Sequence, residues 1–139
     1  MKRFHDAQAP VWSRVARELA AGRKASHWMW FVFPQIAGLG NSPMAVRYAL
    51  GDIEEARRYL GDDILGSRLR DGVRLMLRHG DASARDILGT PDDLKFRSCL
   101  TLFREAAADP ADRELFQAGL DRFYGGQADS RTLNLLGRS

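Results

Sequence analysis

The stretch that decides the fold is Pro91-Asp92-Asp93-Leu94-Lys95-Phe96-Arg97-Ser98-Cys99-Leu100-Thr101-Leu102-Phe103. Its apolar residues recur three and four positions apart, which is the repeat of a helix that buries one face. A proline suits the first turn of a helix, and acidic residues stabilise a helix N-terminus electrostatically. The pattern predicts a strong helix through about Ala108, with an inward stripe of Phe96, Cys99, Leu100, Phe103 and Ala107.

The same local signals continue on both sides of this stretch. Helical spacing, capping side chains, first-turn prolines and glycine stops predict further helices over about residues 10–22, 42–50, 53–60, 62–79, 81–89, 115–123 and 132–136. Only residues 28–33 could be extended instead, since they are apolar on every face. We therefore predict an all-α fold, a compact multihelical single domain over residues 1–139.

Composition places the chain in a broad class. Its 139 residues suit one domain, and 45% hydrophobic and 28% charged residues are ordinary for a soluble globular protein. No apolar run reaches the roughly 20 residues that cross a bilayer, the N-terminus does not read as a signal peptide, and Cys99 has no disulfide partner. We expect a cytoplasmic protein with no membrane association.

The net charge of the chain indicates which kinds of ligand or partner it can bind. The formal net charge is +3, from 21 basic and 18 acidic residues. This small excess permits an anionic small molecule as ligand but does not require a polyanion, so nucleic acid is disfavoured as a partner. No metal site or cofactor is expected, because the cysteine is alone and His5, His27 and His79 lack the spacing of metal ligands.

A second segment of unusual composition covers residues 23–42, RKASHWMWFVFPQIAGLGNS. Buried tryptophans need a partner for the indole N–H, so Trp28 and Trp30 beside two basic residues fit the floor of a site as well as they fit a core. His27 is suited to general acid–base chemistry near neutral pH, or to a hydrogen bond with the backbone. The glycines and the following helix start favour an anion, although a plain turn with a serine cap is the alternative.

Residues 23–42 and residues 91–103 are predicted to form one site. Lys95 is expected to point toward residues 28–42, because both segments are unusual in composition and both start helices near polar residues. His27 is the predicted catalytic residue, if the protein is an enzyme, which the sequence leaves open. The predicted ligand-binding residues are Lys24, Trp28, Trp30, Gln35, Gly38, Gly40, Ser42 and Lys95.

The run from Gly22 to Ser42 resembles the signature of a bacterial family catalogued as domain of unknown function 1810. Further matches are Gly89-x-Pro91-Asp92-Asp93-x-Lys95, Thr101-Leu102-Phe103 and Phe123-Tyr124-Gly125-Gly126, so the resemblance spans essentially the whole chain. It implies a compact, mostly helical domain and no established activity. Members are sometimes called calpastatin, but calpastatin inhibitory regions are disordered and acidic, unlike this composition.

A fainter similarity connects Trp28-x-Trp30, Gly38-x-Gly40-Asn41 and Thr101-Leu102-Phe103 to helical enzymes that process ADP-ribose derivatives. The leading hypothesis is therefore a small-molecule site for an anionic, nucleotide-like or sugar-phosphate ligand, in an enzyme acting on an ADP-ribose-type derivative or in a binding protein.

Two alternatives remain open. One is a protein–protein interaction module, which predicts a flat, exposed apolar patch in place of a concave pocket. The other is a helical RNA-binding protein that uses the stripe Arg70, Arg74 and Arg78, for which affinity would depend strongly on salt. Sequence alone gives neither the substrate nor the oligomeric state.

Overall fold

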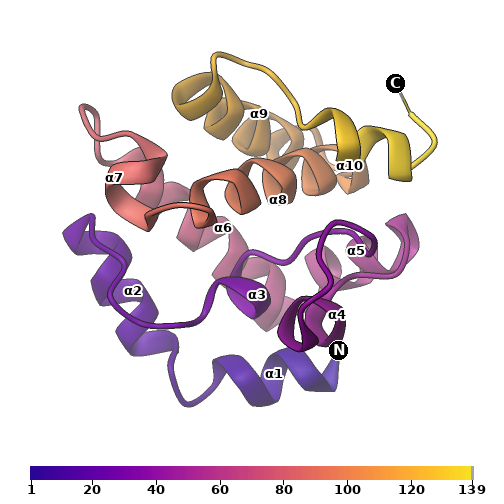
Figure 1. Cartoon of the computed structure of the whole chain (residues 1–139), viewed down its shortest axis with the longest axis horizontal. Coiled ribbons are helices and arrows are strands. Elements are labelled where there is room, and N and C mark those ends of the chain that lie inside the picture. The colour runs from indigo at the N-terminus through magenta and orange to yellow at the C-terminus, as the bar shows by residue number, and fades with distance from the viewer. Residues whose placement is uncertain (139) are drawn as a thin grey trace.

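This computed structural model describes residues 1–138, which contain ten α-helices joined by loops (Figure 1). The all-α prediction is confirmed: the described residues contain no strand, only an isolated parallel bridge between Ile36 and Leu50. The helices are α1 (Lys2–Gln8), α2 (Trp12–Ala21), α3 (Met29–Val32), α4 (Pro43–Tyr48), α5 (Ile53–Gly61), α6 (Asp63–Leu77), α7 (Ala84–Leu88), α8 (Asp92–Ala106), α9 (Pro110–Tyr124) and α10 (Ser130–Leu135).

Helix α8 is the centre of the core. It packs along α9 and also contacts α5, α7 and α10, so that helices from both halves of the chain meet on it (Figure 1). The stripe predicted from the sequence faces inward: Phe96, Cys99, Leu100, Phe103 and Ala107 are all buried. None of the helices in residues 1–138 combines the length and the apolar character that crossing a bilayer requires.

Most helix starts lie where the sequence predicts them, because local capping decides them. In α4, α5, α6, α7, α9 and α10 a side-chain oxygen accepts a hydrogen bond from a backbone N–H of the first turn. The capping residues are Ser42, Asp52, Asp62, Ser83, Asp109 and Asp129. Helix α1 was not predicted, since it buries only Phe4 and Gln8 and lacks a side-chain cap.

Residues 28–33, which the sequence left open between helix and extended chain, form the single turn α3. A turn this short depends on tertiary contacts, and a buried polar network supplies them. The Gln8 amide donates to the backbone oxygen of Phe31 at 2.6 Å and lies 2.9 Å from the Tyr59 hydroxyl. Helices α1, α3 and α5 are thereby fixed to one another.

Close packing on α6 holds the chain that follows α3. A Cβ at Gly72 would lie 3.1 Å from the ring of Phe33, so glycine lets this ring approach the helix axis. Phe33 in turn contacts Phe96 of α8, with ring centroids 4.8 Å apart. The loop that begins after Phe33 is therefore anchored between α6 and α8.

Candidate functional site

A groove of about 460 Å³ separates the loop after α3 from the first half of α8. In the view of Figure 1 this loop lies below α8 and α10, and α4 lies below the loop. One wall consists of Gln35, Leu39, Gly40, Asn41, Ser42 and Ala45; the other consists of Pro91, Leu94, Lys95, Arg97, Ser98, Asp129 and Arg131. The groove therefore joins the two segments that the sequence singled out.

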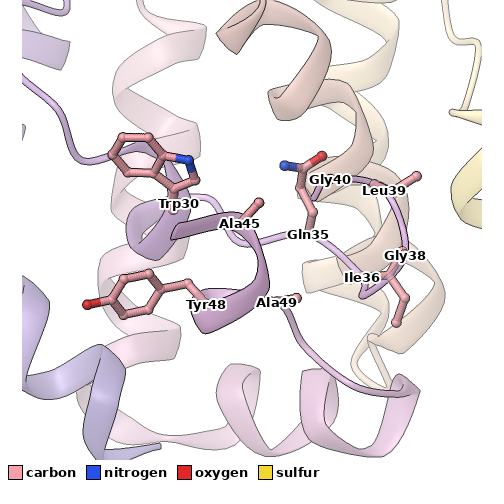
Figure 2. Close-up of a pocket in the computed structure, with 9 residues that line it drawn as sticks. All are labelled: Trp30, Gln35, Ile36, Gly38, Leu39, Gly40, Ala45, Tyr48 and Ala49. Atoms are coloured by element: carbon pink, nitrogen blue, oxygen red, sulfur yellow. The ribbon is translucent and has the colours of Figure 1, made fainter. Parts of the chain in front are cut away.

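A smaller recess shares part of its lining with the groove (Figure 2). Trp30 and Tyr48 lie at one end of it, and the side-chain amide of Gln35 lies beside the loop that carries Gly40 at the other. The recess and the groove share Gln35, Leu39, Gly40 and Ala45. Gln35 thus faces both hollows.

The loop is pinned at its base and at its bend. The Ala37 N–H donates to the Leu50 carbonyl at 2.8 Å, and the Leu50 N–H donates to the Gln35 carbonyl at 2.9 Å. Gly38 has φ +104°, and a Cβ there would lie 3.1 Å from the Leu135 side chain of α10. Glycine is needed at this bend, because it permits both the positive φ and the close approach to α10.

Two lysines, of which Lys95 lines the groove, share one carboxylate. Asp92 lies 2.9 Å from the Lys24 ammonium and 3.5 Å from the Lys95 ammonium. Each lysine also lies over an indole ring, Lys24 over Trp28 at 5.2 Å and Lys95 over Trp30 at 5.5 Å from the ring centroid. The prediction that Lys95 points toward residues 28–42 is confirmed.

Some of the predicted site residues line the groove or the recess, and the others line neither. Gln35, Gly40, Ser42 and Lys95 line the groove, and Trp30, Gln35, Gly38 and Gly40 line the recess. Lys24, His27 and Trp28 line neither hollow. His27 is exposed, Lys24 is paired with Asp92, and Trp28 is 1% exposed.

Trp28 is buried in the core, where its indole N–H has a hydrogen-bond partner. Of the two tryptophans that were predicted to form the floor of the site, only Trp30 lines a hollow. The indole N–H donates to the Glu18 carboxylate at 2.9 Å, which satisfies the polar group that the sequence argument assigned to a site edge. The Trp28 ring lies against the Lys24 ammonium and is buried, so it does not present a surface to a ligand.

Sequence reasoning did not find Glu18, a half-buried residue of α2. Partial burial acts to raise the pKa of this carboxyl, but hydrogen bonds from Ser26, Ala25 and Trp28 outweigh it and lower the pKa to about 2. Glu18 is eight residues before Ser26, and no spacing rule links a helix residue to the loop after it. The charge of Glu18 therefore fixes the segment that leads into α3.

Arg97 was not among the residues predicted for the site. Its guanidinium donates to the carbonyl oxygens of Gln127 and Ala128 at 2.8 and 3.0 Å and lies over the Tyr124 ring. Within residues 1–138 it forms no ion pair with a carboxylate. Arg97 thus holds the chain between α9 and α10 while leaving its charge beside the groove.

The groove is electropositive. Three of its lining residues are cationic (Lys95, Arg97 and Arg131) and one, Asp129, is acidic. Lys95 has only a 3.5 Å contact with Asp92, so its charge is not fully committed to that pair. Low-dielectric walls around like charges focus a positive potential and attract anions.

The start of α4 does not contribute in the way the sequence suggested. Helix α4 has six residues, and the Ser42 hydroxyl accepts the Ala45 N–H at 3.1 Å. A helix this short has a weak dipole, and its cap already occupies a first-turn amide. Attraction for an anion therefore comes from the side chains of the opposite wall.

The arginine stripe on α6 is partly neutralised. Arg70 binds the Asp112 carboxylate with two hydrogen bonds of 2.7 and 2.9 Å, and Arg74 lies 3.5 Å from Asp71. A bidentate pair removes Arg70 from any surface that would contact phosphates. This arrangement gives the RNA-binding alternative less support than the groove gives the small-molecule site.

Comparisons with known proteins find matches that cover nearly the whole chain. A family model described as "Protein of unknown function (DUF1810)" matches residues 1–136. The chain is also similar to the conserved hypothetical protein Rv1873 from Mycobacterium tuberculosis, known from a crystal structure at 1.38 Å. The two are 49% identical with a TM-score of 0.94, over 99% of this chain and 96% of that one. No curated protein matches.

Proposed function

We propose that this chain, which belongs to the DUF1810 family of proteins of unknown function, binds an anionic, nucleotide-like or sugar-phosphate ligand in the groove between the loop and α8. One observation carries the proposal: Lys95, Arg97 and Arg131 line a groove that adjoins the recess of Trp30. The combination offers cations for a phosphate in the groove and an aromatic surface in the recess beside it, and the two hollows share four lining residues.

The cations differ in how they would act on a phosphate. Lys95 and Arg131 have long side chains that can follow a ligand, whereas Arg97 is held by the carbonyl oxygens of Gln127 and Ala128. A fixed guanidinium loses little conformational entropy when it binds an oxyanion. Arg97 therefore sets the position of the phosphate, and the other two add charge.

The aromatic end of the site accounts for the nucleotide-like part of the proposal. Trp30 is half-buried, and one part of it lines the recess. The recess itself, at about 20 Å³, has room for about one water molecule, so a base would stack on the part of Trp30 outside it, where stacking gains roughly 1–3 kcal/mol. Gln35 lines both hollows, and its side-chain amide can donate to and accept from the edge of a base.

ADP-ribose is the first ligand to test, because it combines a planar base, two phosphates and sugar hydroxyls. His27, the predicted catalytic residue, does not line the groove, and the carboxylate that does line it, Asp129, is the N-cap of α10. Binding is therefore proposed, and an enzymatic step on an ADP-ribose-type derivative is a finer proposal that the binding experiment must precede.

Calorimetry tests the proposal with ADP-ribose, AMP and ribose 5-phosphate. We expect saturable binding to the wild type, and a loss of affinity of about tenfold or more in Lys95→Ala and in Trp30→Ala. Lys2→Ala is the matched control, because Lys2 is exposed and pairs with Asp6 on α1. No binding of any of these compounds at millimolar concentration, with all variants folded, refutes the proposal.

A second candidate function rests on exposed apolar side chains near the groove. Leu94 lines the groove and is 58% exposed; Leu135, which packs beside Gly38, is 49% exposed. An exposed leucine in the wall of a groove suits a protein interaction surface. If small anions do not bind, and Leu94→Ser changes the oligomeric state in sedimentation experiments, the interaction module takes precedence.

A further inference from the structure

Asp129 is the one acidic residue among the described residues that line the groove. It shares the groove with Lys95, Arg97 and Arg131. A carboxylate in a site for phosphate alone would repel the ligand and weaken its binding. Asp129 therefore favours a ligand that carries a hydrogen-bond donor in addition to its phosphate.

The hydrogen bonds of the Asp129 side chain are concentrated on one oxygen. Oδ2 accepts from the Thr132 N–H at 3.0 Å and from the Thr132 hydroxyl at 2.6 Å, and the Ser98 hydroxyl lies 3.2 Å away. Thr132 and Ser98 are both buried. Within residues 1–138 no hydrogen bond reaches Oδ1. The carboxylate is thus held by one oxygen, which leaves the other able to accept.

The backbone of Asp129 is held as firmly as its side chain. The Asp129 N–H donates to the Thr101 hydroxyl at 2.9 Å, and this hydroxyl donates to the Arg97 carbonyl at 2.8 Å. The Arg97 guanidinium binds the two residues just before Asp129. An acceptor with so many constraints is preorganised, so a hydrogen bond to it costs little ordering of the protein.

We infer that Asp129 selects a sugar phosphate, by accepting a hydrogen bond on Oδ1 from a sugar hydroxyl while the cations hold the phosphate. This inference rests on the proposed function and names the ligand class of the same groove. Hydroxylated phosphates, including the ribose phosphate part of a nucleotide, satisfy both charges of the groove. Inorganic phosphate and pyrophosphate have no sugar hydroxyl: their only donor is an acidic P–OH group, and once that proton is lost their negative charge lies against the carboxylate.

The test compares ribose 5-phosphate with pyrophosphate by calorimetry, in the wild type and in Asp129→Asn. Asparagine is as good a helix cap as aspartate, so its oxygen can keep the hydrogen bonds of Thr132 while its amide replaces Oδ1. The acceptor then becomes a donor. We expect affinity for ribose 5-phosphate to fall about tenfold or more, and affinity for pyrophosphate to rise.

Two further variants separate selection from stability. Asp109→Asn makes the same change at the cap of α9, outside the groove, and should alter neither affinity. Asp129→Ser keeps a capping oxygen but has nothing in place of Oδ1, and it serves if the asparagine variant does not fold. It too should lose affinity for ribose 5-phosphate and gain affinity for pyrophosphate.

The outcomes distinguish the two levels of the argument. If the wild type binds neither compound, nor ADP-ribose, the groove is not an anion site and the proposed function fails. If the wild type binds but folded Asp129 variants lose affinity for both compounds equally, or keep their affinity for ribose 5-phosphate, the groove binds anions and the role of Asp129 is overturned.

Discussion

Replacing Glu18 by glutamine tests how the chain behind the groove is held. The Oε1 atom of Glu18 accepts hydrogen bonds from the Ala25 N–H at 2.7 Å, the Ser26 N–H at 3.1 Å and the Trp28 indole N–H at 2.9 Å. Its Oε2 accepts from the Ser26 hydroxyl at 2.6 Å. Glutamine has the same size and keeps one acceptor oxygen, so the variant removes the charge and preserves the packing.

The magnitude follows from the pKa. Partial burial raises the pKa of Glu18, the hydrogen bonds lower it by more, and it falls from 4.5 to about 2. At about 1.4 kcal/mol per pKa unit this corresponds to about 3 kcal/mol for a fully shielded group. Because Glu18 is partly exposed, solvent screens the interaction, and we expect Glu18→Gln to lower the free energy of unfolding by about 1–2 kcal/mol at neutral pH.

The pH dependence has a definite sign. The pKa of Glu18 is lower in the folded chain, so its contribution is complete above about pH 4.5 and is lost as the pH falls toward 2. Urea unfolding of both proteins should show the full difference at neutral pH and about half of it near pH 3. Glu114→Gln, an exposed change on α9, is the control and should be neutral. Equal stabilities at neutral pH, or a difference that does not shrink with acid, would refute the reasoning.

Two further predictions concern packing. Gly66→Ala should lower the free energy of unfolding by about 3 kcal/mol or more, because a Cβ there would lie 2.1 Å from the Leu60 carbonyl oxygen. Gly61→Ala, with open space at its Cβ, should be neutral or stabilising in the same thermal unfolding experiment. Cys99 should resist a thiol reagent at neutral pH until the protein unfolds, because burial raises the pKa of its thiol well above the usual value. Rapid modification of native protein would contradict this.

The fold could be predicted largely from the sequence because its helices start and stop on local signals. Asp52, Asp62 and Ser83 cap helices with their own side chains, and such bonds reach only two or three residues along the chain. Helix α1 and the single turn α3 depend on the contacts of Gln8 with Phe31, far away in the sequence. Elements made by such contacts carry no local pattern to predict them.

The site could be predicted only in part, for the same reason. Lys95, Gln35 and Ser42 were found because they lie in segments of unusual composition, and they do line one groove. Trp28 was placed in the site because composition cannot distinguish the floor of a pocket from a core. Asp129 was not predicted for the site, because its position in the groove depends on contacts with residues such as Ser98, which is 31 residues away.

The most direct test of the central claim is a titration of nitrogen-15-labelled protein with ADP-ribose, followed by amide chemical shifts. If the groove is the site, the largest saturable shifts will occur at Gly40, Ser42 and Ser98, which line it on both walls. Lys95→Ala should reduce those shifts at equal ligand concentration. Largest shifts around the separate hollow between Arg104 and Gln117, or no shifts at millimolar ligand, would contradict the account.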